Sequence, residues 1–153
     1  MRSVAYVEAS VVSYLTSRPS RDVVIVARQQ VTREWWRTAQ ERFHLTASEL
    51  VIREARQGDP NAARARLTRL EGVTLLDATA GAERLARELV SSGVVPPTAP
   101  VDAAHIAIAT ANRVHYLVTW ISATSPMRPC GPGSSGCAGA MGTTPLSSAL
   151  PTS

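Results

Sequence analysis

Residues 101–120 read V-D-A-A-H-I-A-I-A-T-A-N-R-V-H-Y-L-V-T-W, and this stretch decides the fold class. Its first part, 102–111, is rich in alanine and isoleucine and predicts a helix buried against other elements. Its second part, 114–120, carries β-branched and aromatic residues and predicts a strand. A helix that leads directly into a strand is typical of proteins in which the two alternate along the chain.

The rest of the chain repeats this alternation. Short apolar runs predict further strands at 3–7, 43–47 and 73–76. Helical spacing and capping residues predict a helical turn after the first strand, and helices at 23–42, between Ser48 and Gly58, between Pro60 and Gly72, and at 82–90. We therefore expect one α/β domain over residues 1–120, with a parallel sheet.

The long helix at 23–42 carries apolar residues at spacings of three and four. They are Val24, Ala27, Val31 and Trp35. This stripe predicts the buried face of an amphipathic helix. It assigns Trp35 to the core and leaves the neighbouring Trp36 on the surface.

Composition limits the functional classes. The chain has 153 residues, of which 44% are hydrophobic and 18% charged, as in an ordinary globular domain. No apolar run is long enough to span a membrane, and the N-terminus does not resemble a signal peptide, so we expect a soluble cytoplasmic protein. All 16 basic residues are arginine, which excludes a phosphate-binding P-loop lysine. The formal net charge of +4 favours an acidic partner, nucleic acid or protein.

Three acidic residues stand where strands lead into helices. Glu8 follows the first strand, Glu54 lies on the apolar face of the helix after the second strand, and Asp102 opens the helix at 102–111. In open α/β sheets ligands bind at the carboxyl ends of the strands, so the fold can gather these side chains. Three carboxylates together form an oxygen-only site for Mg²⁺ or Mn²⁺. Such a site can activate water against a phosphodiester.

Each acid also has a simpler interpretation. Glu8 could be a favourable charge beside a helix N-terminus, and Glu54 could lie on a partly exposed helix edge. Asp102 could cap its helix. His105, one turn beyond Asp102, could act as a general base, although a packed and hydrogen-bonded histidine is the commoner case.

The pattern as a whole resembles the PIN-domain ribonucleases, and among them the toxins of bacterial type II toxin–antitoxin pairs. The resemblance covers residues 3–120. It rests on three motifs in order, Y-V-E-A-S-V-V-S-Y-L, S-E-L-V-I-R-E and V-D-A-A-H-I-A-I-A-T-A-N-R-V-H-Y-L-V-T-W.

This resemblance implies a three-layer α/β/α sandwich and hydrolysis of RNA by a metal-activated water. It implies that Glu8, Glu54 and Asp102 are catalytic residues that bind one or two Mg²⁺ or Mn²⁺ ions, with Ser10 and Thr119 as supporting polar residues. It also implies an antitoxin protein that blocks the site, and a homodimer.

Two alternatives remain open. A catalytically degenerate module of the same fold would bind an antitoxin or RNA without cleaving. A nucleotide-binding α/β protein is the weaker alternative, because no glycine-rich phosphate loop follows the first strand.

The chain changes character after Trp120. Residues 121–153 carry one charge, no aromatic residue and five of the nine glycines, so we expect a disordered tail. Its two cysteines, Cys130 and Cys137, are compatible with an incidental pair, a short-loop disulfide or a metal site. The PIN resemblance also breaks here, because the family places an acid or asparagine where this chain has Ile121, and a final helix and strand are missing.

We hypothesise that a frameshift directly after Trp120 produced this break, and codons chosen to encode the family's continuation illustrate how. In the family that the chain resembles, the strand continues as T-W-N-F-R-H-I-A-N. The codons TGG AAT TTC CGC CAC ATC GCC AAT GCG encode W-N-F-R-H-I-A-N-A. Loss of one A from AAT yields W-I-S-A-T-S-P-M followed by arginine, which is the sequence from Trp120 to Arg128.

We expect the nucleotide sequence around codon 121 to encode N-F-x-H once one base is restored. Sequencing the gene checks this. A restored frame that lacks the N-F-x-H pattern would show that the tail is not a frameshift product.

Overall fold

The computed structural model describes residues 2–120 and the backbone of residues 142–145. Four strands form an all-parallel sheet in the order β3-β2-β1-β4. They are β1 (Ser3–Val7), β2 (Phe43–Ser48), β3 (Thr74–Leu76) and β4 (Tyr116–Thr119). A fifth strand, β5 (Gly142–Pro145), pairs antiparallel with β4. The predicted α/β class with a parallel sheet is confirmed.

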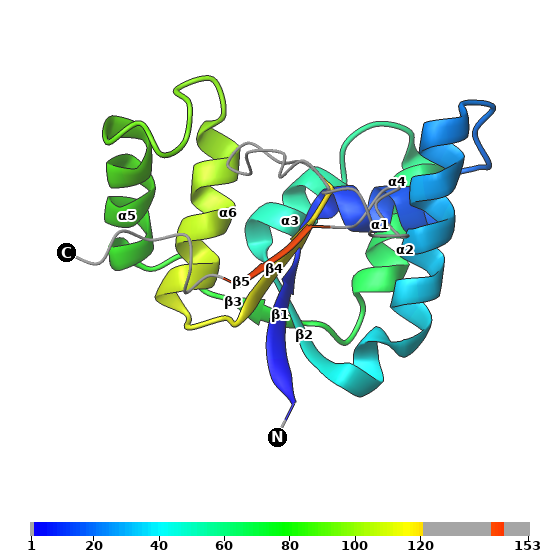
Figure 1. Ribbon diagram of the computed structural model, residues 1–153, viewed down its shortest axis with the longest axis horizontal. Helices are drawn as coiled ribbons and strands as arrows, with labels where there is room; N and C mark the ends of the chain where they lie inside the picture. Colours follow the sequence, from blue (N-terminus) through cyan, green and yellow to red (C-terminus); the bar gives the residue numbers. More distant parts are fainter. Residues whose placement is uncertain (1, 121–141, 146–153) are drawn as a thin grey trace, which may run out of the picture.

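The helices lie on both sides of the sheet (Figure 1). On one side α5 (Ala80–Ser91) and α6 (Pro100–Ala111) pack against each other. The other side carries α1 (Ala9–Thr16), α2 (Val23–Arg42), α3 (Glu49–Ala55) and α4 (Pro60–Leu70). The arrangement is the expected α/β/α sandwich.

The strand order places a topological switch point between β1 and β4. From β1 the chain continues to β2 and β3 on one side, and β4 then adds to the other side. In the register of this pair Val7 lies opposite Val118. The residues that follow them are therefore neighbours at the carboxyl edge of the sheet, which is where ligands bind in open α/β sheets.

Local sequence explains where the helices begin and end. The side chain of Asp22 accepts hydrogen bonds from the first N–H groups of α2, and Asp59 and Thr79 do the same for α4 and α5. Gly93, which follows α5, has a φ of 80°, a conformation that glycine adopts without strain. The start of α2 after Asp22 agrees with the expected cap, whereas α5 begins two residues before the expected start at 82 because Thr79 caps it.

The core lies between the sheet and its two helical layers. Its largest fully buried side chains include Tyr6, Val7, Val11, Val51 and Val118. Three of these come from the central strands β1 and β4, which explains why those runs are apolar without alternation.

The predicted buried face of α2 is only partly confirmed, since Val31 and Trp35 are partly buried and pack against the core. Val24 is 60% exposed and Trp35 is half-buried, whereas Trp36 is buried. The buried positions include two polar residues, Gln29 and Thr32. Both side chains have hydrogen-bond partners, so their burial leaves no polar group unpaired. The spacing of apolar residues alone therefore could not locate the buried face of the helix.

Gln29 and Thr32 bind segments far from their own helix turn. The Gln29 amide donates to the Ser17 hydroxyl (2.7 Å) and the Arg18 carbonyl (2.9 Å), and its oxygen accepts from the Ser20 N–H (3.2 Å). The Thr32 hydroxyl accepts from the Trp120 indole N–H (2.8 Å). These bonds attach α2 to the preceding loop and to the end of β4.

The tail predictions fall mostly outside the described residues. Residues 121–141 and 146–153, including Cys130 and Cys137, are not described, and the expected disorder there stays a prediction. Within the described part of the chain no helix combines the length and hydropathy that a membrane crossing needs.

We expect Gln29→Met to lower the free energy of unfolding by about 1–3 kcal/mol, because it removes the three hydrogen bonds that the buried Gln29 amide makes to the loop at Ser17, Arg18 and Ser20. The matched control is Gln30→Met on the exposed neighbouring position, which should change stability by less than about 0.5 kcal/mol. Urea denaturation of both variants checks this. Equal losses in the two variants would contradict the role given to Gln29.

Candidate metal centre

Glu8 lies between β1 and α1, at the carboxyl edge of the sheet. Its N–H donates to the Val118 carbonyl (3.1 Å), which fixes the backbone beside β4. The residue is only 4% exposed, and its side chain makes no capping hydrogen bond to α1. The simpler interpretation of Glu8 as a helix-end charge therefore does not account for its burial.

Two hydroxyl groups hold the Glu8 carboxylate. Ser10 Oγ donates to Oε2 (2.5 Å), and Thr119 Oγ1 donates to the same oxygen (2.8 Å). Ser10 Oγ also accepts from the Trp120 N–H (3.0 Å). The structure thus places both expected supporting residues against Glu8. Within the described residues, the other oxygen, Oε1, has no hydrogen-bond donor.

Glu54 reaches the same place from α3. This helix begins after Ser48, whose side chain accepts from the Val51 N–H (3.5 Å). The Glu54 side chain is 27% exposed, and its Oε1 lies 2.5 Å from His105 Nε2. Glu54 is therefore a partly exposed acid at the rim of the core, and its contact with the buried His105 is one that a free helix edge would not provide.

His105 approaches from the opposite helical layer, on α6. It is 2% exposed, and its Nδ1 lies 2.7 Å from the Tyr6 hydroxyl. The same hydroxyl lies 2.7 Å from Ser48 Oγ. The expectation of a packed and hydrogen-bonded histidine is confirmed, and its partners join both helical layers to β1.

Burial raises the pKa of the Tyr6 phenol far above its ordinary value, because the charged form cannot be hydrated there. The hydrogen bond from Ser48 acts in the opposite direction and is the smaller effect, and the negative charges of Glu54 and Glu8 add to the rise. Tyr6 therefore keeps its hydroxyl proton and can donate it in a hydrogen bond.

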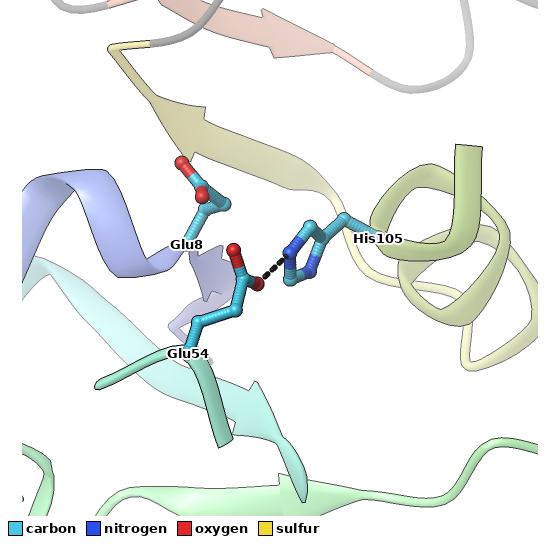
Figure 2. Close-up of side chains that lie close together, drawn as sticks. All are labelled: Glu8, Glu54 and His105. Carbon is cyan, nitrogen blue, oxygen red and sulfur yellow. Dashed lines mark hydrogen bonds and ion pairs between the residues drawn. The ribbon is translucent and has the colours of Figure 1, made fainter. Parts of the chain in front are cut away.

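Glu8, Glu54 and His105 form a group that could hold a metal ion (Figure 2). One ligand atom from each residue lies within 4.8 Å of the others. Figure 2 shows the three side chains converging from the β1–α1 junction, α3 and α6, with the second Glu54 oxygen on the side of Glu8.

Asp102 stands beside this group and is not one of its three members. It occupies the first turn of α6, whose N-cap is Ala99, so the structure gives Asp102 no N-cap role. Partial burial is the main cause that raises the pKa of Asp102, and the negative charge of Glu8 adds to it. The Asp102 carboxylate therefore lies within electrostatic range of the group. The third member of the group is His105, where the sequence predicted Asp102.

The charge of this region is not balanced by arginine. Within residues 2–120, the ion pairs are Arg56 with Glu49 and His105 with Glu54. Three carboxylates near the sheet edge thus have one histidine as their only potentially cationic partner in that range. A buried charge needs a partner, and carboxylate oxygens are the ligands that Mg²⁺ and Mn²⁺ prefer. The residues present fit a divalent cation.

Tyr6 and Ser48 were not predicted as site residues. The sequence identifies Ser48 only as a helix cap and Tyr6 only as part of a buried strand. A polar hydroxyl in the middle of an apolar strand is the one signal that could have singled out Tyr6, because such a group needs a buried partner.

Comparison of the chain with models of protein families, with curated proteins and with solved structures finds no match. The chain is an α/β protein with a buried acidic and histidine cluster that could hold a metal ion.

We expect Asp102→Asn to stabilise the metal-free protein. The pKa of Asp102 is higher in the folded than in the unfolded chain, so stability falls as the pH rises from 3.8 through the folded value. At neutral pH that loss is complete, and asparagine removes it. The gain should be roughly 0.5 kcal/mol or less, because solvent screens a partly exposed group.

Thermal unfolding in chelator-treated buffer at low and high salt measures this effect. The control is Glu83→Gln, which removes a favourable charge from the exposed first turn of α5 and should be slightly destabilising. If Asp102→Asn destabilises as much as the control, neither the burial of Asp102 nor its repulsion by Glu8 costs stability.

Proposed function

We propose that this chain is a Mg²⁺- or Mn²⁺-dependent endoribonuclease of PIN type, the toxin of a toxin–antitoxin pair. The observation that carries the proposal is the convergence of Glu8 and Glu54 from separate elements, with Asp102 alongside, at one edge of a parallel sheet. The described residues supply no arginine to balance them.

The position of the cluster supports the proposal. Glu8 follows β1 and Thr119 ends β4, so the cluster stands at the switch point between these strands. This is where open α/β sheets bind their ligands. The PIN resemblance, which rests on sequence motifs alone, implies metal binding by the same acids.

The chain's own residues would each have a defined task. The hydroxyls of Ser10 and Thr119 fix one oxygen of Glu8, and His105 fixes one oxygen of Glu54. The remaining oxygens, with the carboxylate of Asp102, would bind the cation. A bound cation supplies charge stabilisation at the phosphate and lowers the pKa of the attacking water.

The resemblance extends the proposal to partners. An antitoxin protein and a second copy of this chain would be the protein partners, and RNA the substrate. The formal net charge is +4, and every basic residue is an arginine. This excess of positive charge supports an acidic partner.

A degenerate binding module is the second candidate. It is favoured by Ile121, since isoleucine cannot ligate a metal at the position where the family places an acid or asparagine. In this case the chain would bind RNA or an antitoxin without cleaving.

Thermal unfolding with millimolar Mn²⁺ tests the proposed centre. A ligand bound only by the folded state raises stability by about 2.7 kcal/mol at a hundredfold excess over Kd. We expect a rise of this order in the unaltered chain and its loss in Glu54→Gln. The matched control is Glu49→Gln, an exposed acid on the same helix, which should keep the full Mn²⁺ effect.

Cleavage then separates the two candidates. A labelled single-stranded RNA pool incubated with Mn²⁺ should be cut by the unaltered chain and left intact by Asp102→Asn. RNA retention on a filter without cleavage, equal in both proteins, would identify the binding module. A chain that unfolds cooperatively without any response to Mn²⁺ would overturn the metal centre itself.

A further inference from the structure

We infer that Tyr6, Ser48 and His105 form a one-way hydrogen-bond chain that makes His105 a proton donor to Glu54 instead of a metal ligand. His105 is then a positioning residue, and the centre is reserved for cations that prefer oxygen. The identity of the cation rests on the proposed function, whereas the direction of the chain does not.

The two ends of this chain are fixed by chemistry. At one end the Val51 N–H can only donate, and the Ser48 hydroxyl oxygen accepts from it. At the other end an ionised Glu54 carboxylate can only accept. Ser48, Tyr6 and His105 lie between these ends, and each is at most 2% exposed.

The protons between the ends have one arrangement that satisfies every group. Ser48 donates to Tyr6 (2.7 Å), and Tyr6 donates to His105 Nδ1 (2.7 Å). A neutral histidine whose Nδ1 accepts carries its proton on Nε2. That proton points to Glu54 Oε1 (2.5 Å).

The opposite direction fails at both ends. If Tyr6 donated to Ser48, the Ser48 hydroxyl proton would have no acceptor among the described residues, and a buried unpaired donor is costly. A neutral His105 would then carry its proton on Nδ1. Its Nε2 lone pair would face the Glu54 carboxylate at hydrogen-bond distance, with no proton between two acceptors.

The direction of the chain has a consequence for the metal. A protonated Nε2 has no lone pair to offer, so His105 cannot ligate while it holds Glu54. The centre is left with carboxylate oxygens, which suit Mg²⁺ and Mn²⁺, whereas an imidazole ligand would favour Zn²⁺. Tyr6 and Ser48 thereby influence which cation binds, although neither is a metal ligand.

Nitrogen-15 NMR of histidine-labelled, metal-free protein at mildly alkaline pH measures the tautomer directly. We expect the His105 signals of a ring with a protonated Nε2 and an unprotonated Nδ1, and the same pattern after addition of Mg²⁺. A proton on Nδ1 would overturn the inference, and so would loss of the Nε2 proton on Mg²⁺ addition.

Tyr6→Phe removes the donor to Nδ1 while keeping the buried ring. We expect a mixture of His105 tautomers, a loss of Mn²⁺ affinity of about tenfold, and a rise of similar size in the ratio of Zn²⁺ to Mn²⁺ affinity. The control is Tyr116→Phe on β4, whose hydroxyl lies outside this chain of hydrogen bonds and which should change neither quantity.

The outcomes for the two proposals are separable. An unaltered chain that binds no Mn²⁺ overturns the proposed function, and the tautomer measurement still decides the direction of the chain. An unchanged tautomer and metal preference in Tyr6→Phe would show that Tyr6 has only a packing role.

Discussion

The arrangement of the candidate centre depends on the two hydrogen bonds of the Tyr6 hydroxyl. Tyr6 lies on β1, and its two hydrogen bonds reach Ser48 at the start of α3 and His105 on α6. These elements belong to the central sheet and to the two opposite helical layers. One buried hydroxyl therefore ties the start of α3 to α6 across β1, because a buried polar group must keep its partners.

The second constraint is electrostatic. The fold buries Glu8 almost completely and brings Glu54 and Asp102 near it. The hydroxyls of Ser10 and Thr119 and the ring of His105 satisfy individual oxygens, but they do not neutralise the charge. An arrangement that costs stability in the absence of a cation is typical of sites kept for function. Partial burial, and after it the negative charge of Glu8, raises the pKa of Asp102, and a cation bound among these carboxylates would offset both effects.

The sequence predicted the elements well because each carried its own local signal. The strands at 3–7 and 43–47 are short apolar runs, and the helices open at residues such as Asp22 and Ser48 that cap them. The buried face of α2 was predicted only in part, for the opposite reason. Gln29 and Thr32 are polar, and only their distant partners make their burial possible.

The sequence by itself determined the α/β class, the parallel sheet, and the placement of Glu8, Glu54 and Asp102 near strand and helix ends. Those follow from hydrophobic spacing and caps, which are local properties. The tertiary structure alone decided that His105 stands third in the cluster and that Tyr6 and Ser48 support it. Tyr6 lies 42 residues from Ser48 and 99 from His105, and no local pattern records partners that meet only when the sheet and both helical layers have packed.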